Sequence, residues 1–239
     1  MQSEAVVRAN AVRNEILNAY YRDTYKQVLF SGGAQGAGTW LFEKSLEAHW
    51  RDRSPSRTLE LGAGSGEHLP FVLNIPKNEY VALDLHPNRA GSIPEVSEEM
   101  SEVLNFVEGD AHSIPFPNDY FDRVSSTCLM HHVDEPLAVF YEMRRVVRPG
   151  GEIAVVLPTD PGLLNQMVKR LVTYRRIRSS TANRPQLIYA MEHPNHVGAL
   201  VELAKHVFAS DKVRFRYRPF FLPSWNSNLW INLHVEIAK

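Results

Sequence analysis

The chain has 239 residues, a hydrophobic fraction of 44% and a net charge of −1 at neutral pH. This size suits one large domain or a core domain with a cap, and the composition excludes a disordered chain. The near-zero charge argues against a dedicated nucleic-acid binder, and the single cysteine, Cys128, excludes an internal disulfide and a cysteine-built zinc site. Without an apolar run of roughly 20 residues or a signal-peptide pattern, we expect a cytoplasmic protein with no transmembrane segment.

Residues 1–50 are predicted to form a helical cap, or lid. Apolar residues recurring every four positions indicate a helix over about residues 4–30, and a second helix is expected from Trp40 to Trp50. The glycine-rich segment 31–38 follows a helix and lacks a Gly-Lys-Ser/Thr ending, so we interpret it as a hinge rather than a phosphate loop. The aromatic candidates for closing over a ligand are Tyr20, Tyr21, Tyr25 and Trp40.

From residue 51 to 239 the pattern changes to short apolar runs that alternate with helices. This pattern is typical of a parallel sheet with helices on both faces. Asp134 and Pro136 are expected to begin a helix, and the segment 148–151 is expected to end it. Five apolar runs are predicted as strands: Thr58–Leu61, Tyr80–Leu83, Val103–Val107, Phe121–Ser125 and Ile153–Leu157.

The last third of the chain is expected to contain a helical, substrate-binding insertion at about residues 160–208. One helix follows Asp160, and another spans His196 to Phe208. Two further strands, Val213–Arg218 and Leu229–Ile237, indicate an antiparallel hairpin at a sheet edge. The fold class predicted is therefore α/β, with seven strands, mostly parallel, and an antiparallel last strand.

A glycine-rich loop follows the first predicted strand and leads toward a helix expected near residues 67–73. Glycine at positions 62, 64 and 66 permits a sharp turn and lets a ligand approach the backbone. The third glycine comes one position earlier than in the dinucleotide-binding fingerprint. By itself, such a loop is a weak indication of any particular ligand.

Two acidic residues end the next two strands. Asp84 lies 20 residues after Gly64, where a carboxylate can accept hydrogen bonds from ribose hydroxyls. Asp110 lies in Glu108-Gly109-Asp110-Ala111, where it can accept a hydrogen bond from an adenine amine. The alternatives are a helix-capping role for Asp84 and a turn role for Asp110.

Five blocks of sequence carry a family resemblance between Arg57 and Pro158. They are Leu59–Gly66, Ala82–Asp84, Gly109–Phe116, Phe121–His132 and Arg145–Gly151. In this order they resemble the class I S-adenosylmethionine-dependent methyltransferases, especially the ubiquinone-biosynthesis-like, small-molecule branch (Methyltransferase type 11). The resemblance implies a Rossmann-like fold and S-adenosylmethionine as the cofactor.

The resemblance also implies which residues hold the cofactor. The glycine loop would pass the methionine part, and Glu60 would help to hold its amino group. Asp84 and Asp110 would hold ribose and adenine, and the backbone of Thr127 and Cys128 would line the methionine side. The predicted cofactor-binding residues are Glu60, Gly62, Ala63, Gly64, Asp84, Leu85, Asp110, Ala111, Thr127 and Cys128.

Histidines are the candidates for a base, because an oxygen or nitrogen acceptor has a proton to lose near neutral pH. We name His193, His196 and His132 as candidate catalytic residues, with Glu192 as a group that orients either loop imidazole. A structural or cofactor-lining role for His132 and its neighbour His131, and plain surface exposure of the loop histidines, are the alternatives. No metal site is predicted, because the loop offers too few obvious ligands.

Basic residues dominate the segment between Pro161 and Met191, which has no acidic residue. They would attract a phosphate, a carboxylate or an anionic lipid surface, and the alternative is a solvated helix face. The basic residues are Lys169, Arg170, Arg175, Arg176, Arg178 and Arg184, with Arg214, Arg216 and Arg218 on one side of a strand. The Glu-His-x-Asn-His loop resembles methyltransferases of bacterial surface-polysaccharide clusters, which implies a sugar.

The function expected is methyl transfer to an oxygen or nitrogen of a small molecule, with an anionic or sugar-containing metabolite favoured. Three alternatives stay open: a nicotinamide-dependent oxidoreductase, a non-catalytic methyltransferase-fold partner protein and an RNA methyltransferase. No appended RNA-binding module is recognisable, and no nucleic-acid partner is expected. The sequence leaves the oligomeric state open.

Overall fold

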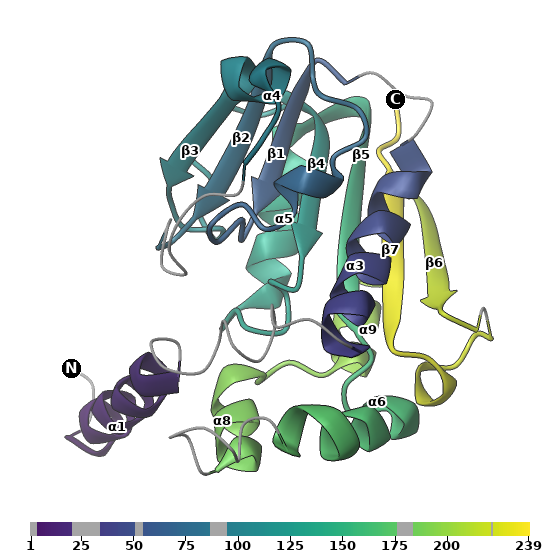
Figure 1. Cartoon of the computed structure of the whole chain (residues 1–239). Helices are drawn as coiled ribbons and strands as arrows, with labels where there is room; N and C mark the ends of the chain where they lie inside the picture. The colour runs from purple at the N-terminus through teal and green to yellow at the C-terminus, as the bar shows by residue number, and fades with distance from the viewer. Residues whose placement is uncertain (1–3, 21–33, 51–54, 87–94, 176–183, 221) are drawn as a thin grey trace.

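A seven-stranded sheet forms the centre of the computed structural model, which describes residues 4–20, 34–50, 55–86, 95–175, 184–220 and 222–239 (Figure 1). The strand order is β3-β2-β1-β4-β5-β7-β6, and only β7 runs antiparallel to its neighbours. The strands are β1 (Arg57–Leu61), β2 (Glu79–Asp84), β3 (Leu104–Glu108), β4 (Phe121–Thr127), β5 (Val147–Pro158), β6 (Lys212–Arg218) and β7 (Trp230–Glu236). This confirms the predicted fold class.

Helices cover both faces of the sheet. On one face α5 (Pro136–Val146) packs against α9 (Val197–Val207), and both contact β5. On the other face α3 (Ala34–Glu47) and the 3-10 turn η2 (Ala48–Trp50) lie over β5 and β7 (Figure 1). The remaining helices are α1 (Glu4–Tyr20), α4 (Glu98–Val103), α6 (Leu163–Val168), the π-helical turn η4 (Lys169–Thr173), α8 (Pro185–Glu192) and the 3-10 turns η3 (Leu69–Phe71) and η5 (Trp225–Ser227).

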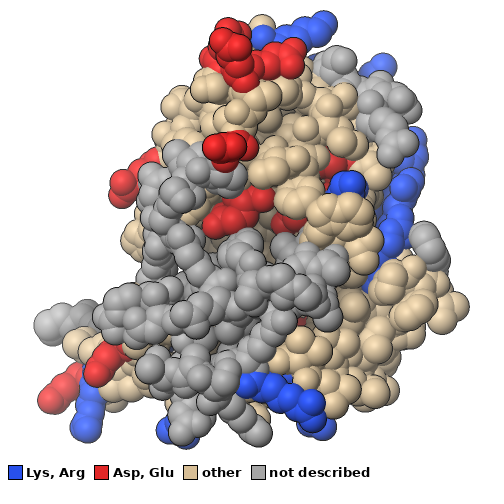
Figure 2. All heavy atoms as spheres, viewed as in Figure 1, with Lys and Arg blue, Asp and Glu red and all other residues tan. Residues whose placement is uncertain are grey.

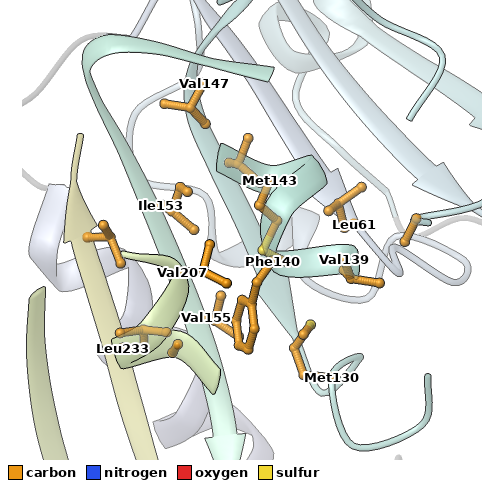
Figure 3. Packing of buried hydrophobic residues seen from close by; sticks show 14 of the residues in the cluster. Leu61, Met130, Val139, Phe140, Met143, Val147, Ile153, Val155, Val207 and Leu233 are labelled. Atoms are coloured by element: carbon orange, nitrogen blue, oxygen red, sulfur yellow. The ribbon is translucent and has the colours of Figure 1, made fainter. Parts of the chain in front are cut away.

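The side chains of β5 alternate between the two faces of the sheet and belong to a hydrophobic cluster on each face. Ile153, Val155 and Leu157 belong to the main cluster with α5 and α9 (Figure 3). Ala154 and Val156 point the other way and pack beneath α3. Successive side chains of a strand alternate between faces. A strand that is buried on both faces therefore needs a continuous run of apolar residues, and the sequence contains this run.

Several predicted boundaries are wrong. The helix expected near residues 67–73 is only the short turn η3. Helix α5 begins at Pro136 with Glu135, not Asp134, at its N-cap. Strand β5 begins at Val147, because the Pro-Gly-Gly segment forms an irregularity inside the strand rather than a loop before it.

The N-terminal helices also differ from the prediction. Helix α3 begins at Ala34, inside the segment interpreted as a hinge, and residues 31–33 lie outside the described residues. Helix α1 is described to Tyr20, so the predicted extension to residue 30 lies outside them as well. None of the described helices has the length and hydropathy that a bilayer-spanning segment needs.

Candidate active site

A cavity of about 800 Å³ lies at the carboxyl ends of the parallel strands. This is the edge at which ligands bind in open α/β sheets, next to the point where the strand order reverses, here between β1 and β4. All ten predicted cofactor residues line this one cavity: Glu60, Gly62, Ala63, Gly64, Asp84, Leu85, Asp110, Ala111, Thr127 and Cys128. The opposite wall comes from α1, η4 and α8.

The glycine loop after β1 has a backbone that only glycine adopts without strain. Gly62 and Gly66 have φ angles of +72° and +85°. A Cβ atom on Gly62 would lie 2.9 Å from Leu129 Cβ, and one on Gly66 would lie 2.6 Å from a methyl of Leu69. Glycine therefore serves two needs here: a left-handed turn and close packing against the neighbouring segments.

Two carboxylates project from the ends of neighbouring strands. Asp84 accepts hydrogen bonds from the backbone N–H of Gly64 (2.9 Å) and of His86 (2.7 Å). Asp110 accepts from the backbone N–H and the ring of His112, and the first of these bonds contributes most to holding the pKa of Asp110 below its usual value. Asp84 thus fixes the glycine loop while it lines the cavity.

Glu60 is the buried acid of the cofactor region. Its side chain accepts a hydrogen bond from the hydroxyl of Tyr80 at 2.8 Å, and the residue is only 1% exposed. Burial raises the pKa of Glu60 to about 7, although nearby His68 and the Tyr80 bond act in the opposite direction. A carboxyl in this state is poised to ionise when a cationic group enters the cavity.

A buried network that the sequence analysis did not identify joins α3 to the loop after β1. The ring of His68 lies 2.5 Å from Glu43 and 3.1 Å from Glu47, its two carboxylate partners. Burial alone would lower the pKa of His68, but these acids outweigh it and raise that pKa well above the usual value. Glu47 also lies 3.6 Å from the guanidinium of Arg123, which stacks over the ring of Trp50 at 4.3 Å.

Strand β4 ends in an unusual backbone conformation. Cys128 has a φ of +57°, which side chains other than glycine rarely adopt. Such conformations cost free energy and persist where the surrounding structure enforces them, often at functional sites. The conformation turns the chain from β4 into the segment that carries Leu129, His131 and His132 along the cavity.

Three imidazoles meet at the far end of the cavity. The ring centroids of His131, His132 and His193 lie 4.0 to 4.7 Å apart. Nδ1 of His132 donates to the backbone carbonyl of Glu192 at 2.8 Å. Burial lowers the pKa of all three rings, that of His132 to about 3. At neutral pH each ring is therefore uncharged.

The loop that carries His193 is fastened to the end of β4 by Asn195. Its side-chain amide donates to the backbone carbonyls of Val133 (2.5 Å) and Met130 (3.2 Å). These bonds bring a segment from the C-terminal third of the chain against His131 and His132. The sequence motif contained this asparagine, but nothing in its spacing indicated partners 62 and 65 residues earlier.

The nearest carboxylates to His193 are Asp160 and Glu192. Asp160 Oδ2 lies 3.8 Å from His193 Nδ1, and Glu192 Oε2 lies 3.8 Å from His193 Nε2. Asp160 also pairs with Lys169 at 2.5 Å, and the Lys169 ammonium stacks over Tyr189. Burial alone would raise the pKa of Asp160, but His193 and Lys169 outweigh it and hold that pKa below its usual range. Glu192 was predicted from the sequence to orient an imidazole, whereas Asp160 was expected only to precede a helix.

His196, the third candidate catalytic residue, does not line the cavity. It is exposed and caps α9, where its Nδ1 accepts a hydrogen bond from the backbone N–H of Ala199 at 3.3 Å. The structure thus places His196 apart from His132 and His193. Trp40, a predicted lid residue, is 46% exposed, does not line the cavity and packs under the ammonium of Lys44.

The basic residues divide into two groups. Lys169 is buried and paired, whereas Arg170, Arg175 and Arg184 are exposed. Figure 2 shows Lys and Arg side chains along the right-hand edge, where β6 lies, and Lys212, Arg214 and Arg216 of this edge strand are exposed. Charges on an edge strand oppose pairing with another sheet. The predicted residues Tyr21, Tyr25, Arg176 and Arg178 lie outside the described residues.

Helix α1 contributes the outermost wall of the cavity. Arg13, Asn14, Leu17, Asn18 and Tyr20 line it, and Tyr20 is buried against Ile188 of α8. The guanidinium of Arg13 donates to the backbone carbonyl of Met191 at 3.3 Å. Among the predicted lid aromatics that the structure describes, Tyr20 reaches the cavity.

Comparisons with known proteins agree with this geometry. Residues 59–155 match the family model described as a methyltransferase domain. The chain is 27% identical to an uncharacterized methyltransferase, YcgJ, of Bacillus subtilis, over 66% of this chain and 62% of that protein. It is 25% identical to the ubiquinone/menaquinone biosynthesis C-methyltransferase UbiE of Coxiella burnetii, over 52% of this chain and 54% of that protein. The matches thus span less than two thirds of these curated relatives.

A solved structure supports the fold. The chain superimposes on a 1,6-didemethyltoxoflavin N1-methyltransferase of Burkholderia thailandensis, solved with that substrate and S-adenosylhomocysteine, with a TM-score of 0.57. The two share 14% identity, and the match covers 100% of this chain and 92% of the other. Together, the matched segment 59–155 and the strand order identify a methyltransferase domain of Rossmann-like fold in this chain.

Proposed function

We propose that this chain binds S-adenosylmethionine in the cavity and transfers its methyl group to an oxygen or nitrogen of a small molecule. The observation that carries the proposal is the continuity of the cavity. One end is lined by the ten residues predicted to hold the cofactor, and the other by His131, His132 and His193. A methyl donor and its acceptor can therefore meet inside one enclosure.

The residues at the cofactor end suit the chemical groups of this ligand. S-adenosylmethionine supplies a methyl group on a positively charged sulfur. Asp84 has carboxylate oxygens for ribose hydroxyls, Asp110 has one for an adenine amine, and Glu60 can ionise against an ammonium. Gly62 and Gly64 line the cavity with bare backbone, so a ligand can approach the loop closely.

The acceptor end favours a small substrate. It is lined by α1, η4 and α8, with Tyr20, Lys169 and Tyr189 in its walls. Alignment of the acceptor with the methyl carbon in a water-poor enclosure is the main task of such a site. We retain His193 and His132 as residues that act on the acceptor, and we assign α1 the role of a lid.

An anionic or sugar-containing acceptor is the substrate class that we propose. Arg13 lines the cavity, and Arg170, Arg175 and Arg184 are exposed on the elements around it. Phosphate and carboxylate groups bind guanidinium groups through paired hydrogen bonds. A long-range attraction of this kind weakens with salt.

Calorimetry with S-adenosylhomocysteine and with NADH tests the cofactor assignment directly. We expect saturable binding of the first and no binding of the second. Transfer of a labelled methyl group to a panel of sugar phosphates, uncharged sugars, phenols and amines then tests the acceptor class. Binding of NADH alone contradicts the whole proposal, whereas labelling of only uncharged acceptors contradicts the anionic part.

A further inference from the structure

The histidine cluster has the composition of a metal site. One ligand atom from each of His131, His132 and His193 can be chosen so that all three lie within 4.8 Å of one another. A tetrahedral Zn²⁺ ion with bonds of about 2.0 Å holds its ligand nitrogens about 3.3 Å apart, so modest rotations of the rings suffice. No metal site was predicted from the sequence, because the loop that carries His193 offers too few obvious ligands by itself; His131 and His132 come from a different segment.

The hydrogen bonds around the rings leave lone pairs for a cation. His132 uses its Nδ1–H on the carbonyl of Glu192, which fixes the ring and leaves Nε2 as an acceptor. Within the described part of the chain, the buried Nδ1 atom of His131 has no hydrogen-bond partner. Buried polar atoms without partners are uncommon, and an unseen ion is one of their ordinary explanations.

The charged groups nearby also suit a cation. Asp160 lies 3.8 Å from Nδ1 of His193. A carboxylate beside the ring nitrogen that does not bind the metal commonly orients a metal-binding imidazole. Glu192 Oε2 lies 3.8 Å from Nε2 of the same ring. Two cationic groups act on the rings within the described part of the chain: Lys169, which pairs with Asp160, and Arg13, which lies 3.8 Å from Asp134.

We propose that His131, His132 and His193 bind one divalent transition-metal ion of the Zn²⁺ or Co²⁺ type. Imidazole ligands suit such ions, and three protein ligands leave a position open toward the cavity. This open position binds an oxygen of the methyl acceptor, an inference that rests on the proposed function. The acceptor class thereby narrows to hydroxyl compounds, whose oxygen a cation holds and polarises.

Metal binding is measured on the full chain without an affinity tag, after dialysis against EDTA. Titration with Co²⁺, followed by its visible absorption and by elemental analysis, is expected to give one ion per chain. His193→Asn and His132→Asn should each weaken Co²⁺ binding at least 100-fold. Asp160→Asn should weaken it by about 10- to 100-fold, because Asp160 only orients a ligand. His206→Asn, at an exposed position on α9, serves as the matched control and should change nothing.

Equal Co²⁺ affinity of the wild type and His193→Asn, or less than 0.1 ion per chain, overturns the metal site. Circular dichroism of each variant verifies that the fold is intact. Binding of S-adenosylhomocysteine in EDTA separates this failure from a failure of the proposed function. If the chain binds S-adenosylhomocysteine but no metal, the methyltransferase assignment stands and the three imidazoles are metal-free. If the chain binds Co²⁺ but not S-adenosylhomocysteine, only the methyltransferase assignment is contradicted.

Discussion

At the cofactor end of the cavity the polar groups come from the ends of adjacent parallel strands, whereas at the acceptor end most come from helices and loops outside the sheet. Glu60 and Asp84 are held by the sheet and the glycine loop. His193 and Lys169 belong to segments that only meet in space. The first arrangement depends on the sheet itself, whereas the second depends on how segments outside the sheet pack against it. The two ends should therefore respond differently to substitution.

The largest effect is expected from Asp84→Ala at the cofactor end. The change removes a carboxylate that fixes Gly64 and His86 and that we assign to the ribose. Hydrogen bonds to a charged group contribute about 1.5–3 kcal/mol each, so affinity for S-adenosylhomocysteine should fall about 100-fold. Isothermal calorimetry measures this loss. An affinity within threefold of the wild type would contradict the assignment of Asp84.

Gly66→Ala should destabilise the fold by about 2 kcal/mol, because its φ is +85° and a Cβ would press on Leu69. The matched control is Gly198→Ala in α9, where the new Cβ meets its nearest neighbour at 3.5 Å. There, alanine should be neutral or stabilising by up to about 1 kcal/mol. Thermal unfolding of both variants gives the comparison, and equal losses would show that the loop is not strained.

The pH dependence of cofactor affinity depends on Glu60. Because burial raises its pKa to about 7, the carboxyl is protonated below that pH and ionised above it. An ammonium on the ligand favours the ionised form, so affinity should rise about tenfold from pH 6 to pH 8 and level off. His68, whose pKa is raised well above its usual value, stays charged over this range.

Two measurements check this dependence. Glu60→Gln removes the titrating group and should flatten the profile for S-adenosylhomocysteine. Adenosine, which has no ammonium, should show a flat profile on the unaltered protein. A slope that persists in the variant would assign the titration to another residue.

The smallest effect is expected from His193→Gln on the binding of S-adenosylhomocysteine. The ring lies at the acceptor end, so affinity should stay within about twofold of the wild type while methyl transfer falls. His196→Gln should alter neither quantity, because His196 caps α9 outside the cavity. Direct binding and single-turnover transfer measured side by side would show whether the two ends are separable.

The contrast between the cofactor end and the acceptor end also explains which features could be predicted from the sequence. The spacing from Gly64 to Asp84 follows from one strand–loop–strand unit, so a parallel sheet places both at one edge. Helix α9 and strands β6 and β7 were also predictable from their apolar periodicity. By contrast, the contacts of His131 with His193, and of Asp160 with Lys169, depend on how a helical insertion folds back. Periodicity carries no information about such contacts.

Local sequence patterns are ambiguous where one residue type has two uses. His196 belongs to a polar loop that looked catalytic, yet a histidine can also cap a helix, as it does here. The Pro-Gly-Gly segment looked like a connection, but β5 absorbs it as an irregularity beside Phe121 and Arg123. The predicted boundary of a cap at residue 50 stays a prediction.

The stacking of Arg123 on Trp50 has a consequence for any shortened form of this protein. Arg123 is 2% exposed within β4, and its charge faces Glu47 and the Trp50 ring. A chain beginning after Trp50 would keep the whole family match from 59 to 155 but leave a guanidinium uncompensated inside the sheet layer. Removing one partner of a buried charge costs about 3–5 kcal/mol. The smallest stable unit is therefore longer than the segment by which the family is recognised.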